Sequence, residues 1–166
     1  EAEKLFYDDL EKHSILRLAT FYGPNMRDSL AISVFINAIL NDKDITIHGN
    51  GVQTRCYTHV EDICSGIITV LNSKTNGIFN ISTEEEISVI ELIELIREII
   101  GKEAKKKFVD DRFGQIMHSK IASKKLRTLG WKPNYNLKFG LKQCISLASK
   151  NKNFDTKIID THLLKQ

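Results

Sequence analysis

The 166-residue sequence lacks any apolar run of about 18 residues, which excludes a helix that could cross a membrane. It has few cysteines, and none of the three, Cys56, Cys64 and Cys144, forms a Cys-x-x-Cys pair. Any pairing would leave one thiol over, so we expect neither a disulfide framework nor a cysteine metal site. Small reduced thiols, buried or half-buried, are the better interpretation, and they indicate a cytoplasmic location.

The chain also has little excess charge of either sign. The formal net charge is +3, which is too small to imply nucleic-acid binding by itself. The one basic run, Lys105-Lys106-Lys107, is typical of a solvated surface. The five histidines show no metal-ligand spacing, so we expect no metal site. A hydrophobic content of 42% is enough for a soluble globular protein with a real core.

Strand-like and helix-like segments alternate along the chain, which favours an α/β architecture with a small sheet. Runs of β-forming residues predict strands at 15–21, 45–48, 54–59, 78–82 and 108–109. Apolar residues at helical spacing predict helices over 2–10, 29–40, 61–71, 88–100, 119–129 and 137–148. Gly49-Asn50-Gly51 predicts a tight turn, because glycine and asparagine tolerate positive φ.

The helix over 88–100 has the clearest start and stop. Ser88 and Glu91 have the spacing of a capping box. In this motif the side chain of each residue accepts the backbone N–H of the other. Ile87 and Leu92 have the spacing of a hydrophobic staple, and Gly101 predicts the end of the helix.

Functional information is concentrated in four segments. They are Leu16 to Pro24, Ile45 to Asp62, Gly77 to Ser82, and Asp110 to Gly114 with Lys120 and Leu129 to Pro133. Together and in this order they resemble the carboxy-terminal half of the extended short-chain dehydrogenase/reductase family, more narrowly its NAD-dependent nucleotide-sugar epimerases and dehydratases. The resemblance covers about residues 1–150. Its specific part is the string Gly-x-Gly-x-Gln-x-Arg followed by His-Val-x-Asp.

The resemblance implies a fold and a set of partners. The expected fold is a small substrate-binding α/β part plus the last elements of a truncated NAD(P)-binding Rossmann fold. Residues 1–150 would form this carboxy-terminal half, and residues 151–166 a polar tail that we leave unassigned. The full-length parent would use NAD or NADP, bind an NDP-sugar, and could form a homodimer. Neither nucleic acid nor a membrane is an expected partner.

Two arginines are the candidate ligands for the sugar-nucleotide pyrophosphate. An arginine fork donates to two phosphate oxygens at once, and both Arg55 and Arg112 follow turn or strand-end positions that would fix their backbones. The resemblance places both on the pyrophosphate, whereas without it either could be a surface or ion-paired arginine. Gly49 and Gly51 would let the backbone turn tightly beside the ligand.

The remaining candidate residues rest on the resemblance alone. In the family, the strand before the glycine turn lines the base pocket, and this strand corresponds to Thr46, Ile47 and His48. His48 stands where many relatives carry an aromatic residue, and it could equally be a lone exposed histidine. Gln53 belongs to the specific string and is assigned to substrate binding with it. Thr20 stands where relatives often have an asparagine that faces the sugar.

Three prominent residues are better explained by structure than by catalysis. Trp131 is expected to pack on the edge of the core beside a helix end. Glu61 and Asp62 are expected to be helix-start residues, because carboxylates are favourable near a helix N-terminus.

The chain also lacks the motifs that the family's chemistry requires. It has no Gly-x-x-Gly-x-x-Gly or Gly-x-Gly-x-x-Gly loop for a dinucleotide, and no Tyr-x-x-x-Lys pair for proton transfer at a suitable place. The pair is expected upstream of Glu1, so this chain alone is expected to be inactive and to hold no cofactor. The alternative is a non-catalytic nucleotide-binding or regulatory protein of the same fold; a free-standing small nucleotide-binding module is a third reading.

Overall fold

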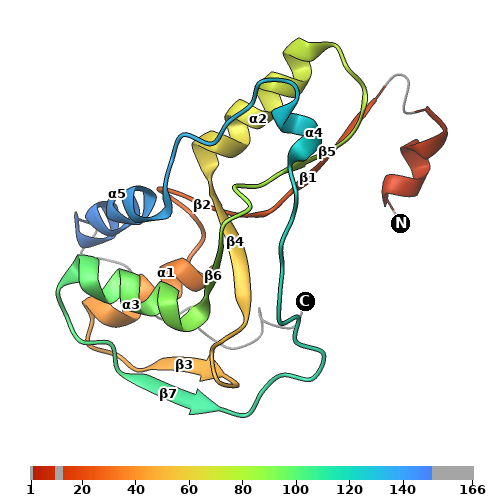
Figure 1. Cartoon of the computed structure of the whole chain (residues 1–166). Helices are drawn as coiled ribbons and strands as arrows, with labels where there is room; N and C mark the ends of the chain where they lie inside the picture. Colours follow the sequence, from red (N-terminus) through yellow and green to blue (C-terminus); the bar gives the residue numbers. More distant parts are fainter. Residues whose placement is uncertain (1, 10–12, 151–166) are drawn as a thin grey trace. The chain divides into compact units, whose positions relative to one another are not determined.

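The computed structural model describes residues 2–9 and 13–150, and it contains three parallel strand pairs with helices packed beside them (Figure 1). The α/β fold class is therefore confirmed. The chain divides into two compact units, each built from three separate segments. Unit 1 takes its residues from 1–22, 54–87 and 118–137, and unit 2 from 23–53, 88–117 and 138–166. The unassigned tail at 151–166 lies outside the described residues.

Unit 1 contains two small sheets and their helices. Its elements are the 3-10 helix η1 (Ala2–Asp9), β1 (Ser14–Leu18), β2 (Thr20–Tyr22), β4 (Thr54–His59), α2 (Val60–Ser73), β5 (Gly77–Ile81), β6 (Glu86–Ser88) and α4 (Lys124–Arg127). Strand β1 pairs in parallel with β5, from Ser14 opposite Gly77 to Leu18 opposite Ile81. Strand β4 lies between β2 and β6.

The core of unit 1 lies where α2 and α4 meet β5. Six buried residues form one cluster there, namely Ile63, Val70, Phe79, Ile81, Leu126 and Trp131. The expectation that Trp131 packs in the core is confirmed, and its indole N–H also donates to the Asp62 carbonyl at 3.2 Å. The packing is tight at Gly66 on α2, where a Cβ would lie 2.9 Å from Ile81 Cγ2 and 3.3 Å from Leu126 Cδ2.

The strand predicted over 15–21 is two strands. Ala19 interrupts it, and its N–H donates to the Ile81 carbonyl at 3.0 Å. Before this residue the chain pairs with β5, and after it with β4, from Thr20 opposite Tyr57 to Tyr22 opposite His59. One apolar run in the sequence therefore pairs with two different strands, β5 and β4. Its composition alone does not predict this division.

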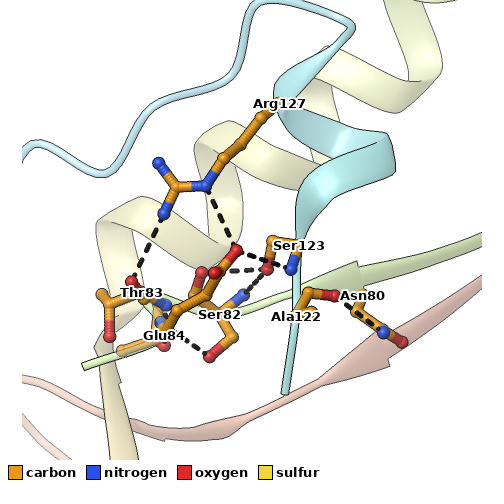
Figure 2. A network of polar contacts seen from close by, with 8 residues as sticks. Asn80, Ser82, Thr83, Glu84, Ala122, Ser123 and Arg127 are labelled. Atoms are coloured by element: carbon orange, nitrogen blue, oxygen red, sulfur yellow. Dashed lines mark hydrogen bonds and ion pairs between the residues drawn. The ribbon is translucent and has the colours of Figure 1, made fainter. Parts of the chain in front are cut away.

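The helix predicted over 119–129 is also wrong in extent, since only Lys124–Arg127 is helical. The residues just before it belong to neither a helix nor a strand, and side chains at and after the end of β5 bind their backbone (Figure 2). Asn80 Nδ2 donates to the Ala122 carbonyl at 2.9 Å, and the Ser123 N–H donates to Glu84 Oε1 at 2.8 Å. These bonds satisfy backbone groups that a helix would otherwise have satisfied.

Glu84 is the centre of this network. Its backbone has a φ of 70°, in the left-handed region, and its carboxylate accepts from Ser123 and from Arg127 Nε at 3.3 Å (Figure 2). The Ser123 backbone bond, assisted by the Arg127 guanidinium, holds the pKa of Glu84 below its ordinary value. The carboxylate is therefore ionised at neutral pH and ties the 118–127 segment to the end of β5.

In its described residues, unit 2 packs three helices and a parallel strand pair. Its elements are α1 (Ala31–Leu40), β3 (Ile45–His48), α3 (Val89–Ile100), β7 (Lys106–Val109) and α5 (Leu137–Lys150). Strands β3 and β7 pair in parallel, with Ile45 opposite Lys106 and His48 opposite Val109. Buried isoleucines supply much of its core: Ile32, Ile36, Ile39, Ile45, Ile47, Ile93 and Ile96.

The start and stop of α3 are confirmed. Ser88 accepts the N–H of Glu91 and the Glu91 carboxylate accepts the N–H of Ser88, which is the complete capping box. Gly101 ends the helix with a φ of 73°. These bonds lower the pKa of Glu91, the Ser88 hydroxyl being the largest cause.

Two smaller expectations need correction. The helix predicted over 2–10 from apolar residues at helical spacing is a 3-10 helix, and Leu5 on it is 82% exposed. The three thiols are free, but only Cys56 and Cys144 are buried, whereas Cys64 is exposed. Burial raises the pKa of Cys144 to about 11. None of the helices in residues 2–9 and 13–150 has both the length and the apolar character needed to cross a bilayer.

Candidate functional site

Four of the predicted site residues lie at one edge of unit 2. In a parallel pair the carboxyl ends of both strands meet at the same edge, which is where α/β proteins bind ligands. Strand β3 carries Thr46 and His48 and runs into the Gly49 turn, and β7 runs into the loop that carries Arg112. Figure 1 labels both strands. Gln53 follows the turn.

The turn after β3 and the loop after β7 are bound to each other. The Gly49 N–H donates to the Val109 carbonyl at 3.0 Å, and His48 Nδ1 lies 3.3 Å from the Asp110 carbonyl. Because a carbonyl only accepts, this contact requires the proton on Nδ1. His48 is half-buried and contacts the backbone of the loop after β7. Thr46 is exposed between the buried Ile45 and Ile47.

Gln53 is 7% exposed, and its side chain is only half satisfied. Its Nε2 donates to the His48 carbonyl at 3.3 Å, while its Oε1 has no hydrogen-bond partner in the part of the chain that the structure describes. The side-chain Nε2 of Gln115 likewise has no hydrogen-bond partner in the described residues. The backbone N–H of Gln115 donates to the Arg112 carbonyl. Buried polar atoms are rarely left unpaired, so this edge of unit 2 has capacity for further hydrogen bonds.

Arg112 is half-buried, and its guanidinium has no ion-pair or hydrogen-bond partner within residues 2–9 and 13–150. A cation in this position can accept an anion without first losing an internal partner. The N-terminus of α3 offers no competing anion site. Its N–H groups at Val89 and Ile90 donate to the Gln53 and Gly51 carbonyls, at 3.2 and 3.1 Å.

The other two predicted residues lie in unit 1, on the β2–β4 pair. Arg55 is half-buried on β4 and donates to the Thr54 carbonyl at 2.7 Å. Thr20 is exposed on β2, opposite Tyr57. Burial raises the pKa of Tyr57 above its ordinary value although the nearby Arg55 charge lowers it, so the phenol is neutral at physiological pH.

Sequence reasoning missed Asp111, Glu86 and His118, three polar residues beside these positions. In unit 2, a Cβ on Gly49 would lie 2.9 Å from Asp111 Cγ, so this carboxylate packs on the glycine turn. In unit 1, Thr54 Oγ1 donates to Glu86 Oε1 at 2.7 Å and lies 3.3 Å from His118 Nδ1. Only Asp111 had a local clue, its position next to Arg112. Within the described residues there is no cluster of three or more histidine, cysteine or carboxylate side chains for a metal ion.

Comparison with known families gives a consistent result. Residues 11–82 match the NAD dependent epimerase/dehydratase family. The chain is 34% identical over 143 residues to a putative UDP-glucose 4-epimerase of Methanocaldococcus jannaschii, covering 84% of this chain and 47% of that protein. It is 34% identical over 145 residues to the dTDP-D-glucose 4,6-dehydratase of Homo sapiens, covering 82% of this chain and 41% of that protein.

The fold of the chain is similar to that of a solved nucleotide-sugar epimerase. The crystal structure of UDP-glucuronic acid 4-epimerase from Bacillus cereus, in complex with UDP-glucuronic acid and NAD, matches with a TM-score of 0.81 and 30% identity. This match covers 89% of the present chain and 48% of the epimerase chain. The chain therefore spans about half the length of the proteins it resembles.

Proposed function

Because this chain belongs to the NAD-dependent epimerase/dehydratase family, we propose that it is the substrate-recognising part of a nucleotide-sugar epimerase or dehydratase. In this proposal Arg112 and Arg55 bind the pyrophosphate of a nucleoside diphosphate sugar. Thr46, His48, Gln53 and Thr20 contribute to the site as the resemblance implies. The chain would correspond to the carboxy-terminal half of the full-length enzyme.

The observation that carries the proposal is the state of Arg112. Its guanidinium is half-buried and without an anionic partner in the described chain, at the edge where both parallel strands end. The buried Oε1 of Gln53 at the same edge lacks a donor, which a nucleoside or sugar hydroxyl could supply. An arginine fork and a hydrogen-bond acceptor together fit a ligand that has both phosphate and hydroxyl groups.

The residues of this chain do not fit the dinucleotide cofactor. A dinucleotide pyrophosphate needs a glycine-rich loop between a strand and a helix N-terminus, and none of the nine glycines has that spacing. The first N–H groups of α3 are already bound to carbonyls. We therefore assign NAD binding and proton transfer to the remainder of the full-length enzyme, and orientation of the sugar nucleotide to this chain.

We expect the purified chain to show no oxidoreductase or epimerase turnover. The test incubates it with NAD⁺ and UDP-glucose, follows NADH by absorbance and separates the sugar nucleotides by chromatography. The UDP-glucuronic acid 4-epimerase of Bacillus cereus, assayed with UDP-glucuronic acid, is the positive control. Turnover above the blank by this chain alone would contradict the assignment of the chemistry to other residues.

Arginine variants should weaken the binding of UDP. Charge-assisted hydrogen bonds contribute about 1.5–3 kcal/mol, so Arg112→Ala should weaken the affinity about 10- to 150-fold by isothermal titration calorimetry. Arg55→Ala should abolish measurable binding of UDP, because it removes the other arginine that the proposal assigns to the pyrophosphate.

Matched controls remove the same charge elsewhere in each unit. Arg97 on α3 pairs with Glu94 at 2.7 Å, and Arg17 on β1 pairs with Glu3 at 2.6 Å. Arg97→Ala and Arg17→Ala should leave the UDP affinity unchanged within about twofold, since exposed ion pairs contribute little. Equal losses in the controls and in Arg112→Ala would mean that only overall charge matters, and the proposed site would be abandoned.

A further inference from the structure

We propose that Asp111 is a positioning residue, which holds Arg112 in place for its ligand through the backbone rather than through an ion pair. This inference rests on the proposed function, because it assigns the way in which Arg112 is presented to the nucleoside diphosphate. Sequence reasoning did not select Asp111, and a carboxylate beside a phosphate-binding arginine would ordinarily be expected to compete with the phosphate.

The first support is the geometry of the Arg112 backbone. Its N–H donates to Asp111 Oδ1 at 2.8 Å, and its carbonyl accepts from the Gln115 N–H at 3.2 Å. Gly114, with a φ of 74°, allows the chain to turn between these residues. Both polar groups of the Arg112 main chain are thus bound, so the residue has a fixed starting point from which its long side chain extends.

The second support is the contact between Asp111 and the glycine turn. Gly49 has a φ of 67°, and a Cβ placed on it would lie 2.9 Å from Asp111 Cγ and 3.0 Å from Oδ2. The carboxylate therefore occupies space that only glycine leaves open at this position. Together with the bond from the Gly49 N–H to the Val109 carbonyl, this contact ties the loop after β7 to the end of β3.

The third support is that Asp111 forms no ion pair with Arg112 in the described residues. Within the described residues it makes no ion pair, and the Arg112 guanidinium is not bound by it or by any other carboxylate. The carboxylate accepts the Arg112 N–H and packs on Gly49, and the guanidinium stays available. A fixed backbone also reduces the freedom that the arginine loses when an anion binds.

The test separates the position of the oxygen from the charge of the side chain. Asp111→Asn keeps an acceptor oxygen at the same place and removes the charge, whereas Asp111→Glu keeps the charge and moves the oxygens by one methylene. Each variant is made alone and with Arg112→Ala, in the whole chain, and UDP affinity is measured by calorimetry. Circular dichroism of each variant checks that the fold is retained.

If Asp111 positions Arg112, Asp111→Asn should bind UDP within about twofold of the unmodified chain, while Asp111→Glu should bind about tenfold more weakly. In the Arg112→Ala background neither change should weaken binding further. The reverse pattern, with Asn altered and Glu retained, would overturn the inference in favour of a purely electrostatic role. Loss of affinity that persists without the Arg112 guanidinium would overturn it as well.

If the proposed function itself is wrong, the UDP-binding measurements will show a different pattern. In that case Arg112→Ala alone would bind UDP as well as the unmodified chain, or the unmodified chain would not bind UDP at all. A failure of the inference alone would leave the effect of Arg112→Ala intact and change only the pattern of the two Asp111 variants.

Discussion

Replacing Asp62 with alanine should lower the free energy of unfolding by about 3 kcal/mol, because two backbone donors lose a buried charged acceptor. The Asp62 carboxylate is 1% exposed and accepts the N–H groups of Asn134 at 2.7 Å and Tyr135 at 3.1 Å. It thereby binds the segment after Trp131 to the first turn of α2. Urea denaturation followed by circular dichroism measures the loss.

Two further variants make this prediction specific to the buried carboxylate. Glu61 stands beside it in the first turn of α2 but is exposed, so Glu61→Ala should cost less than about 1 kcal/mol, the usual contribution of a helix-end charge. Asp62→Asn keeps one acceptor oxygen and should fall between the two. Equal losses for Asp62→Ala and Glu61→Ala would show that the carboxylate acts only on the helix end.

Replacing Gly66 with leucine should also lower the free energy of unfolding by a few kcal/mol. Here the cause is added side-chain volume and not a lost hydrogen bond. Even a Cβ at this position would lie 2.9 Å from Ile81 Cγ2 and 3.0 Å from Ile81 Cδ1. Ile81 is fully buried and cannot move aside cheaply. Overpacking of this kind costs about 3 kcal/mol, and replacing a helical glycine gains about 1 kcal/mol, so we expect a net loss of about 2 kcal/mol. The loss is measured by urea denaturation.

The exposed face of the same helix provides the control. Asn72 is exposed near the end of α2, so Asn72→Leu adds comparable bulk with nothing to displace, and its effect should stay within about 0.5 kcal/mol. Gly66→Ala should fall between Gly66→Leu and the unmodified chain, since it adds the close contact but not the further side-chain volume. A Gly66→Leu chain as stable as the control would show that α2 can shift away from β5.

Features that depend on neighbouring residues were predictable from the sequence. The capping box of Ser88 and Glu91 joins residues three positions apart, and Gly101 ends the same helix through its own backbone preference. Most strand and helix positions followed from local periodicity in the same way.

Features that depend on distant partners were not predictable. The helix expected over 119–129 is shortened where its backbone bonds to side chains about 40 positions earlier, with Asn80 donating and Glu84 accepting. Asp62 was correctly placed in the first turn of a helix, but its buried bonds lead to residues more than 70 positions later. Local propensity contains no information on such partners, and tertiary contacts override it.

The same distinction applies to the site. The motif string selected Gln53 and Arg55, and the resemblance added Arg112. Their surroundings, however, depend on the pairing of β3 with β7, which begin 61 positions apart at Ile45 and Lys106. Only that pairing brings Asp111 against Gly49, so the residue in contact with the turn could not be identified from its own segment.

The parallel pairing of β1 with β5 has a consequence for biosynthesis. Ser14 leaves the ribosome 63 residues before its partner Gly77. At about 5–20 residues per second, the backbone of the first strand stays unpaired for roughly 3–13 s. During that interval β1 is an exposed strand edge in a growing polypeptide, open to pairing with another nascent chain. Rapid elongation between these two strands, or a chaperone that covers β1 until β5 emerges, would therefore raise the yield of folded protein.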